Sequence, residues 1–139
     1  MNIKTLSVKQ PWAYAIMYLG KDIENRTRKT NMRGLIAIHA SKQIDYDAYY
    51  WLKSDGHELP PLEMLETGKV LGTVELTNCV TEHASEWKED GTFGYVLKNP
   101  QPFKVSFDAK GQLGFWSCEI PQEVFINNSL CFVRSLKAS

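Results

Sequence analysis

Short apolar segments, separated by glycine, proline and asparagine, recur along the sequence and indicate a fold built mainly of β-strands. The clearest candidate is 69–80, where β-branched and other apolar residues dominate. Asn99-Pro100 and Pro102 predict a turn between two alternating segments. The further strands are expected at 6–8, 34–40, 93–97, 103–107 and 115–118.

Short helices are expected between these strands. Residues 10–19 form the first, because Pro11 suits a helix start and Gly20 suits its end. A second helix is expected from about 46 to 55, with Ser41 as its candidate cap, and a helical turn at 62–65. For the tail, 123–136, helix and strand both stay open. One face of the first helix holds Trp12, Ala15, Ile16 and Leu19.

The order of these elements lacks the regular strand-helix alternation of a parallel α/β sheet. Several short strands and two or three short helices therefore predict the α+β class, with a small β-barrel. A length of 139 residues suits one domain, 1–139. Hydrophobic residues make up 43% of the chain and charged residues 23%, which is typical of a globular protein and not of a disordered one.

The sequence contains no apolar run near the roughly 18 residues that a membrane span needs, and residues 1–6 lack the features of a secretory signal. The cysteines and histidines are scattered, without the spacing of a zinc site or a disulfide scaffold. We therefore expect a cytoplasmic protein with free thiols, no metal and no organic cofactor. The residues concerned are Cys79, Cys118, Cys131, His39, His57 and His83.

Charge is distributed unevenly along the chain. The formal net charge is zero, but residues 1–42 contain eight basic and two acidic residues, a net charge of +6 that the remaining residues balance with −6. A basic region of this kind can attract an anionic ligand locally while the rest of the surface repels it. Chance clustering on a solvated surface is the alternative.

Seven sequence blocks, in order, resemble the signature of the ASCH domain family, and together they span 6–116. The resemblance implies a PUA-like β-barrel with a cleft beside the Gly-Lys-x-x-Glu-x-Arg segment. It also implies a role in RNA or nucleotide metabolism, translation or transcription coactivation. The blocks are Leu6-Ser7-Val8-Lys9-Gln10-Pro11-Trp12-Ala13, Gly20-Lys21-x-x-Glu24-x-Arg26-Thr27, Arg33-Gly34, Ile38-His39-Ala40, Val70-Leu71-Gly72-x-Val74-Glu75-Leu76, Lys98-Asn99-Pro100 and Lys110-Gly111-x-x-Gly114-Phe115-Trp116.

Lys21, Glu24 and Arg26 are the central candidates for chemistry at this cleft. A lysine supplies a point charge for phosphate, whereas an arginine can hold phosphate or a base edge with two hydrogen bonds. Glu24 and Arg26 are two residues apart in an extended segment, so we expect them to face the same side. They could hold a ligand, or they could form a structural ion pair at the barrel rim.

An enzymatic alternative involves Glu75. One branch of the superfamily, an amidohydrolase of acetylated cytidine, resembles this chain and uses a lysine, a threonine three residues later and a glutamate on a later strand. Lys21 and Glu75 match the first and last of these, but Glu24 occupies the threonine position, and a carboxylate cannot simply replace a hydroxyl nucleophile. Whether Glu75 faces Lys21 or solvent stays open. As an enzyme, the chain would hydrolyse a modified nucleoside or RNA with Lys21, Glu24 and Glu75 as catalytic residues.

The aromatic residues and His39 also have two interpretations. Trp12 and Trp116 are core residues or platforms for stacking a base. His39 lines the cleft or is a structural histidine with satisfied hydrogen bonds, and Ser41 and Lys42 could add phosphate contacts. The aromatic cluster Tyr46, Tyr49, Tyr50 and Trp51 forms the inner face of a helix or, in an adaptor, anchors a protein partner.

The interpretation that these observations favour is a binding domain for RNA, a nucleotide or a nucleoside, with an unspecified protein partner as a further option. Its predicted ligand-binding residues are Lys9, Gln10, Lys21, Glu24, Arg26, Arg28, Arg33, His39 and Trp116.

Overall fold

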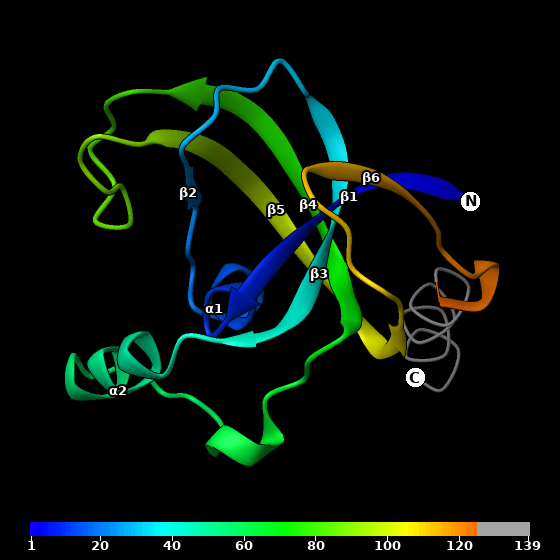
Figure 1. The fold of residues 1–139 in the computed structure, drawn as a ribbon, viewed down its shortest axis with the longest axis horizontal. Helices are drawn as coiled ribbons and strands as arrows, with labels where there is room; N and C mark the ends of the chain where they lie inside the picture. Colours follow the sequence, from blue (N-terminus) through cyan, green and yellow to red (C-terminus); the bar gives the residue numbers. More distant parts are fainter. Residues whose placement is uncertain (125–139) are drawn as a thin grey trace, which may run out of the picture.

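The computed structural model describes residues 1–124, which form six strands and three short helices (Figure 1). The α+β class is therefore confirmed. Most of the tail for which helix and strand were both open lies outside the described residues. The elements in order are β1 (Asn2–Gln10), α1 (Trp12–Tyr18), β2 (Ile23–Arg26), β3 (Gly34–Ile44), α2 (Tyr46–Ser54), the 3₁₀ helix η1 (Leu62–Met64), β4 (Lys69–Val80), β5 (Phe93–Asp108) and β6 (Phe115–Glu119).

All six strands form one mixed sheet in the order β2-β5-β4-β3-β1-β6. β1 and β3 are parallel, and every other pair is antiparallel. Figure 1 shows the sheet bent around α1 into a barrel-like shape, consistent with a PUA-like fold, and β2 and β6 are its two edges. The sheet is not closed.

The turn predicted at 99–102 is wrong, because β5 runs through this segment without reversing. Both halves of β5 pair with β4, from Lys69 opposite Asp108 to Val80 opposite Gly94. The register shifts three times along this ladder, and Asn99 has a positive φ of 53°. These bulges accommodate the prolines, which cannot donate a ladder hydrogen bond.

The hydrophobic core consists of two clusters, and α1 belongs to the larger one. The predicted helix is confirmed, but α1 buries Ala13 and Met17 together with Ala15 and Ile16, whereas the expected Trp12 and Leu19 are only partly buried. The second cluster surrounds Phe103, Trp116 and Ile120 near the other end of the sheet.

α2 differs from the sequence prediction at its cap and on its inner face. Asp45, and not Ser41, caps the helix, because its carboxylate accepts a hydrogen bond of 3.0 Å from the backbone N–H of Ala48. Ser41 instead belongs to β3. Of the four aromatic residues expected on the inner face, the structure buries Tyr49 and leaves the others exposed, namely Tyr46, Tyr50 and Trp51.

None of the helices within residues 1–124 is long and apolar enough to cross a membrane.

We predict that Gly72→Ala destabilises the fold, because β4 and β5 approach each other closely at this residue. A Cβ atom at position 72 would lie 2.4 Å from the carbonyl oxygen of Gln101 and 2.8 Å from Cα of Pro102. Backbone atoms cannot move aside cheaply, so we expect the free energy of unfolding to fall by about 1–3 kcal/mol in urea titrations. Gly94→Ala is the control, since the nearest atom there is Cδ of the flexible Lys88 side chain. Equal losses in both variants would contradict this explanation.

Candidate functional site

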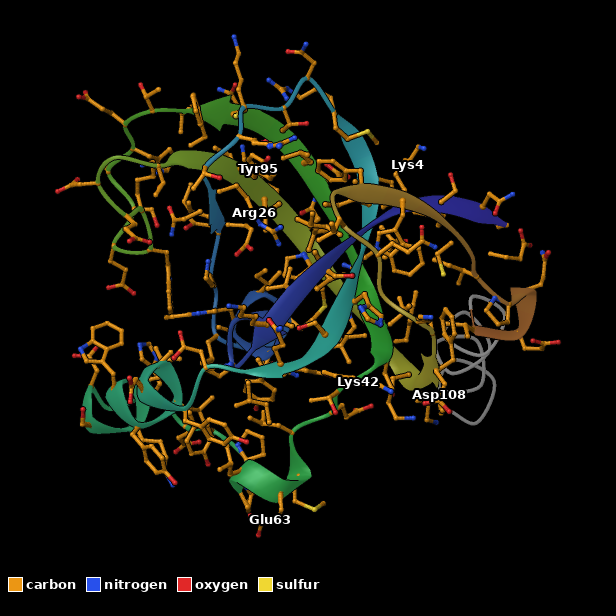
Figure 2. The ribbon with its side chains drawn as sticks, viewed as in Figure 1. Lys4, Arg26, Lys42, Glu63, Tyr95 and Asp108 are labelled. Carbon is orange, nitrogen blue, oxygen red and sulfur yellow. The ribbon has the colours of Figure 1, made fainter. Side chains whose placement is uncertain are left out.

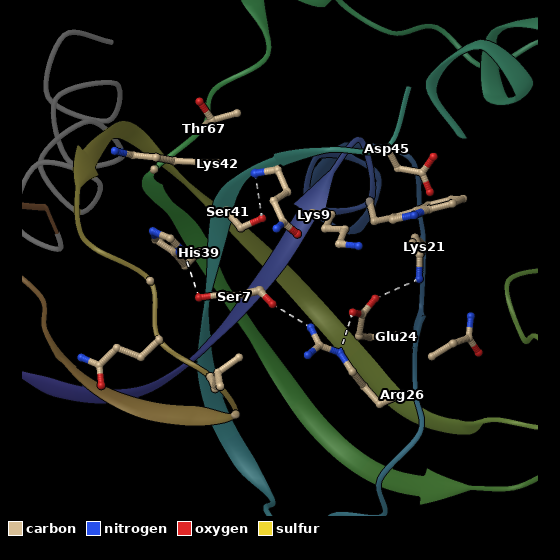
Figure 3. Close-up of a pocket in the computed structure, with 18 of the residues that line it drawn as sticks. Ser7, Lys9, Lys21, Glu24, Arg26, His39, Ser41, Lys42, Asp45 and Thr67 are labelled. Carbon is tan, nitrogen blue, oxygen red and sulfur yellow. Dashed lines mark hydrogen bonds and ion pairs between the residues drawn. The ribbon is translucent and has the colours of Figure 1, made fainter. Parts of the chain in front are cut away.

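The main cavity has a volume of about 1620 Å³ and lies beside the predicted Gly-Lys-x-x-Glu-x-Arg segment. Its floor comes from β1, β2 and β3. Its walls come from α2, the residues just before β4, the β4–β5 loop at 86–89 and the β5–β6 loop at 109–114. Figure 3 shows Ser7, Lys21, Glu24 and Arg26 converging on it from different strands and loops.

Glu24 links Lys21 and Arg26 into one chain of charges (Figure 3). Its Oε1 lies 3.4 Å from Nζ of Lys21, and its Oε2 accepts a hydrogen bond of 2.9 Å from Nε of Arg26. Lys21 also donates to the carbonyl oxygen of Ile23, and Nη2 of Arg26 donates to the carbonyl oxygen of Ser7 at 2.7 Å. Glu24 and Arg26 therefore face the same side of the extended segment, as the spacing predicted.

Lys21 and Glu24 are buried, with 4% and 7% of their surface exposed. Burial lowers the pKa of the Lys21 ammonium, and the Glu24 carboxylate opposes that shift. Nζ of Lys21 also lies over the ring of Trp12, 5.5 Å from its centroid, so a cation covers that ring. Arg26 is partly exposed and lines the cavity, so a ligand can reach it more readily than its two partners.

A second polar network joins His39, Ser7 and Trp116. Nε2 of His39 lies 2.7 Å from the carbonyl oxygen of Ala109, which can only accept, so this nitrogen carries the proton. Burial lowers the pKa of His39, and the neutral ring accepts at Nδ1 from the Ser7 hydroxyl, 3.0 Å away. Nε1 of Trp116 donates to the same hydroxyl at 3.1 Å. His39 is thus a satisfied histidine that also lines the cavity.

This network fixes the β5–β6 loop against the sheet. A Cβ atom at Gly111 would lie 2.8 Å from Cε1 of His39 and 2.9 Å from Oγ of Ser7. Only a residue without a side chain fits there, so the loop rests directly on the pair. The neighbouring Lys110 consequently lines the cavity.

Other predicted site residues lie in several environments. Lys9 and Lys42 are exposed and line the cavity, and the half-buried Ser41 lines it too. Gln10 is buried, and its side chain donates to the carbonyl oxygen of Glu66 and accepts from the N–H of Tyr14.

Five predicted site residues, the buried Gln10 among them, are not among those that line the cavity. Arg28 and Arg33 are exposed elsewhere, and Trp116 is buried in the second core cluster with 7% exposure. Glu75 is exposed on β4 opposite Lys98 of β5. Lys21 therefore has Glu24 as its carboxylate partner.

The cavity also contains residues that the sequence did not single out for ligand binding. The sequence indicated a core or adaptor role for Trp51 and no role for Trp87 and Lys88. Trp87 could have been recognised as a candidate because it is the one aromatic residue in the polar segment 85–90. Its ring lies 5.3 Å from that of His57, which connects the β4–β5 loop to the residues after α2.

We predict that Glu24→Gln destabilises the protein by about 3 kcal/mol, because it leaves the buried Lys21 ammonium without a counter-charge. Chemical denaturation measures the change. The matched control is Glu75→Gln, which removes an exposed carboxylate and is expected to change stability by less than about 0.5 kcal/mol. If both variants behave alike, the buried charge chain does not stabilise the fold.

We predict that His39→Gln alters the pH dependence of stability. Because burial holds the pKa of native His39 below 6.5, the unfolded chain binds a proton first as the pH falls. The contribution of His39 is therefore complete above about pH 6.5 and is lost as the pH falls through the native pKa. The difference in Tm between wild type and His39→Gln should be larger at about pH 7.5 than at about pH 5. A constant difference would contradict a neutral native ring.

A known protein family matches the part of the chain that forms this site. The family model of the ASCH domain matches residues 6–124. Activating signal cointegrator 1 from Homo sapiens is 30% identical over 131 residues, covering 82% of this chain and 22% of the relative. The protein of the same name from Mus musculus is 27% identical over 129 residues, with the same coverage. The chain thus spans about a fifth of the length of these curated relatives. The family match includes the whole charge chain and the Ser7–His39 network, and the chain belongs to the ASCH domain family.

Proposed function

We propose that residues 1–139 act as one domain that binds RNA or a nucleotide in the main cavity. The observation that carries this proposal is a set of cavity lysines whose ammonium groups form no salt bridge within residues 1–124. Lys9, Lys42 and Lys110 line the cavity, and within 1–124 their ammonium groups form no salt bridge and no side-chain hydrogen bond. Asp108 lies near enough to interact with Lys42, but its carboxylate is paired with Lys69. Free ammonium groups around a concave surface attract phosphate.

Several carboxylates of the cavity, in contrast, already have partners. Glu24 is held by Lys21 and Arg26. Asp108 lies 2.9 Å from Nζ of Lys69, and Asp45 caps α2. These carboxylates repel an anionic ligand less than their number suggests, so the part of the cavity near β3 and the β5–β6 loop is effectively cationic.

Family membership supports the same proposal, because ASCH domains are associated with RNA binding. The geometry favours binding over hydrolysis. The hydrolase hypothesis needs Lys21, Glu24 and Glu75 at one site, but Glu75 is exposed beside Lys98 and does not line the cavity. Binding needs only the charges and hydrogen-bond donors that are present.

We predict that wild type binds a fluorescein-labelled single-stranded RNA and that affinity falls steeply as salt rises. The double variant Lys42→Ala, Lys110→Ala should bind about tenfold more weakly, and its log–log salt slope should be shallower by about 0.7 for each phosphate that the missing lysines would neutralise. Fluorescence anisotropy at several salt concentrations measures both quantities.

The control for that experiment is the double variant Lys53→Ala, Lys98→Ala, which removes the same charge from exposed lysines outside the cavity. It should bind as wild type does. Product analysis of the same mixtures, with acetylated cytidine added, tests for turnover. If wild type binds neither this RNA nor the nucleotide CMP at micromolar protein and low salt, the proposed function is wrong.

A further inference from the structure

We propose that the cavity receives a single-stranded segment of more than one nucleotide, with an unpaired base stacked on Trp51 and its phosphates near Lys42 and Lys110. This inference rests on the proposed function and adds the form of nucleic acid and its orientation.

The cavity is larger than a pocket for a single small ligand. Pockets for drug-sized ligands measure about 300–1,000 Å³, whereas this one measures about 1620 Å³. A single nucleoside would leave much of it empty. A segment of two or more nucleotides fits this volume better.

The two ends of the cavity differ in chemistry, and this difference orients the bound strand. Lys42 packs beside Gly68, and the carbonyl oxygen of Gly68 accepts a hydrogen bond from the N–H of Ala109, so the neighbouring Lys110 belongs to the same end. Figure 3 shows Lys42 and His39 on one side of the site and Lys21 and Asp45 on the other. Ammonium groups and the Ser41 hydroxyl at the first end suit phosphate oxygens.

The opposite end is aromatic and acidic. Trp51 of α2 and Trp87 of the β4–β5 loop line it, and the contact between His57 and Trp87 holds the loop near the end of α2. Glu86 and Glu89 line the same end. Carboxylates repel phosphate but accept hydrogen bonds from the exocyclic amines of bases. Bases therefore suit this end, and the backbone suits the lysine end.

Trp51 is the residue best able to stack a base. Three of the four tryptophans line the cavity, but Lys21 covers the ring of Trp12 and His57 lies against Trp87. Trp51 is 57% exposed and has no ring contact with another aromatic residue or a cation within 1–124. An exposed ring can stack only on a base that is unpaired and unstacked, which favours a single strand over a duplex.

The test compares Trp51→Ala with Tyr50→Ala. Tyr50 is the neighbouring residue on α2, is 59% exposed and does not line the cavity, so it is a matched control. Each protein is titrated with a labelled single-stranded hexanucleotide RNA, with the duplex of the same sequence and with unlabelled CMP as competitor. Melting curves of both variants check that the exposed substitutions leave the fold intact.

We expect wild type to prefer the single strand to the duplex and to bind CMP more weakly than the hexanucleotide. Trp51→Ala should weaken single-strand binding about tenfold without changing the salt slope, because stacking involves no counterion release. Tyr50→Ala should match wild type.

The contrary outcomes separate the two proposals. If wild type binds neither RNA nor CMP, the proposed function fails and this inference fails with it. If wild type binds CMP but no RNA, the proposed function stands and this inference is wrong. If wild type binds RNA but Trp51→Ala binds equally well, or the duplex binds as tightly as the single strand, the proposed function stands and this inference is wrong. Equal affinity for CMP and the hexanucleotide would overturn the claim of a segment longer than one nucleotide.

Discussion

β4 pairs along its length with β3 on one side and β5 on the other, and both ladders contain register shifts. Bulges increase the local twist and bend the bulged strand. The sheet consequently curves around α1 (Figure 1). This curvature brings β1, β2 and β3 together as the floor of one cavity, although β2 is at the far edge of the sheet from β6 and is paired only with β5. The site therefore depends on how β4 pairs with its neighbours.

The buried polar groups on this curved sheet form two networks. Glu24 pairs with both Lys21 and Arg26, whereas His39 and Ser7 hold the loop that carries Lys110. No buried side-chain nitrogen or oxygen within 1–124 lacks a hydrogen-bond partner. Satisfied networks of this type fix a single geometry. The groups that the proposed anionic ligand would meet are therefore the exposed side chains around this floor.

Figure 2 shows how widely the charged side chains are distributed over the molecule. Lys4 lies near β6 and Glu63 on η1, whereas Lys42 lies close to Asp108. The net charge of zero is a sum over the whole chain, so it does not describe the cavity, where Lys9, Lys42 and Lys110 form no salt bridge within 1–124. In the proposed mode of binding, the aromatic end of the same cavity would add stacking, which does not depend on salt. Charge would supply the rate of encounter, and the aromatic ring would supply the preference for an unpaired base.

Local patterns in the sequence were sufficient to predict the helix at Trp12–Tyr18, the strand at Lys69–Val80 and the common orientation of Glu24 and Arg26. Each depends on residues within one or two turns of helix or along one strand, and the ordered blocks identified the family. Tertiary structure decided the rest. Pairing with β4 turned the expected turn at 99–102 into a bulged strand, and packing buried Trp116 and left Trp51 exposed. Lys42, Lys110, Trp51 and Trp87 come from different elements and line one cavity only in the folded chain. Periodicity cannot encode this arrangement, because it is set by register between strands that are distant in the sequence.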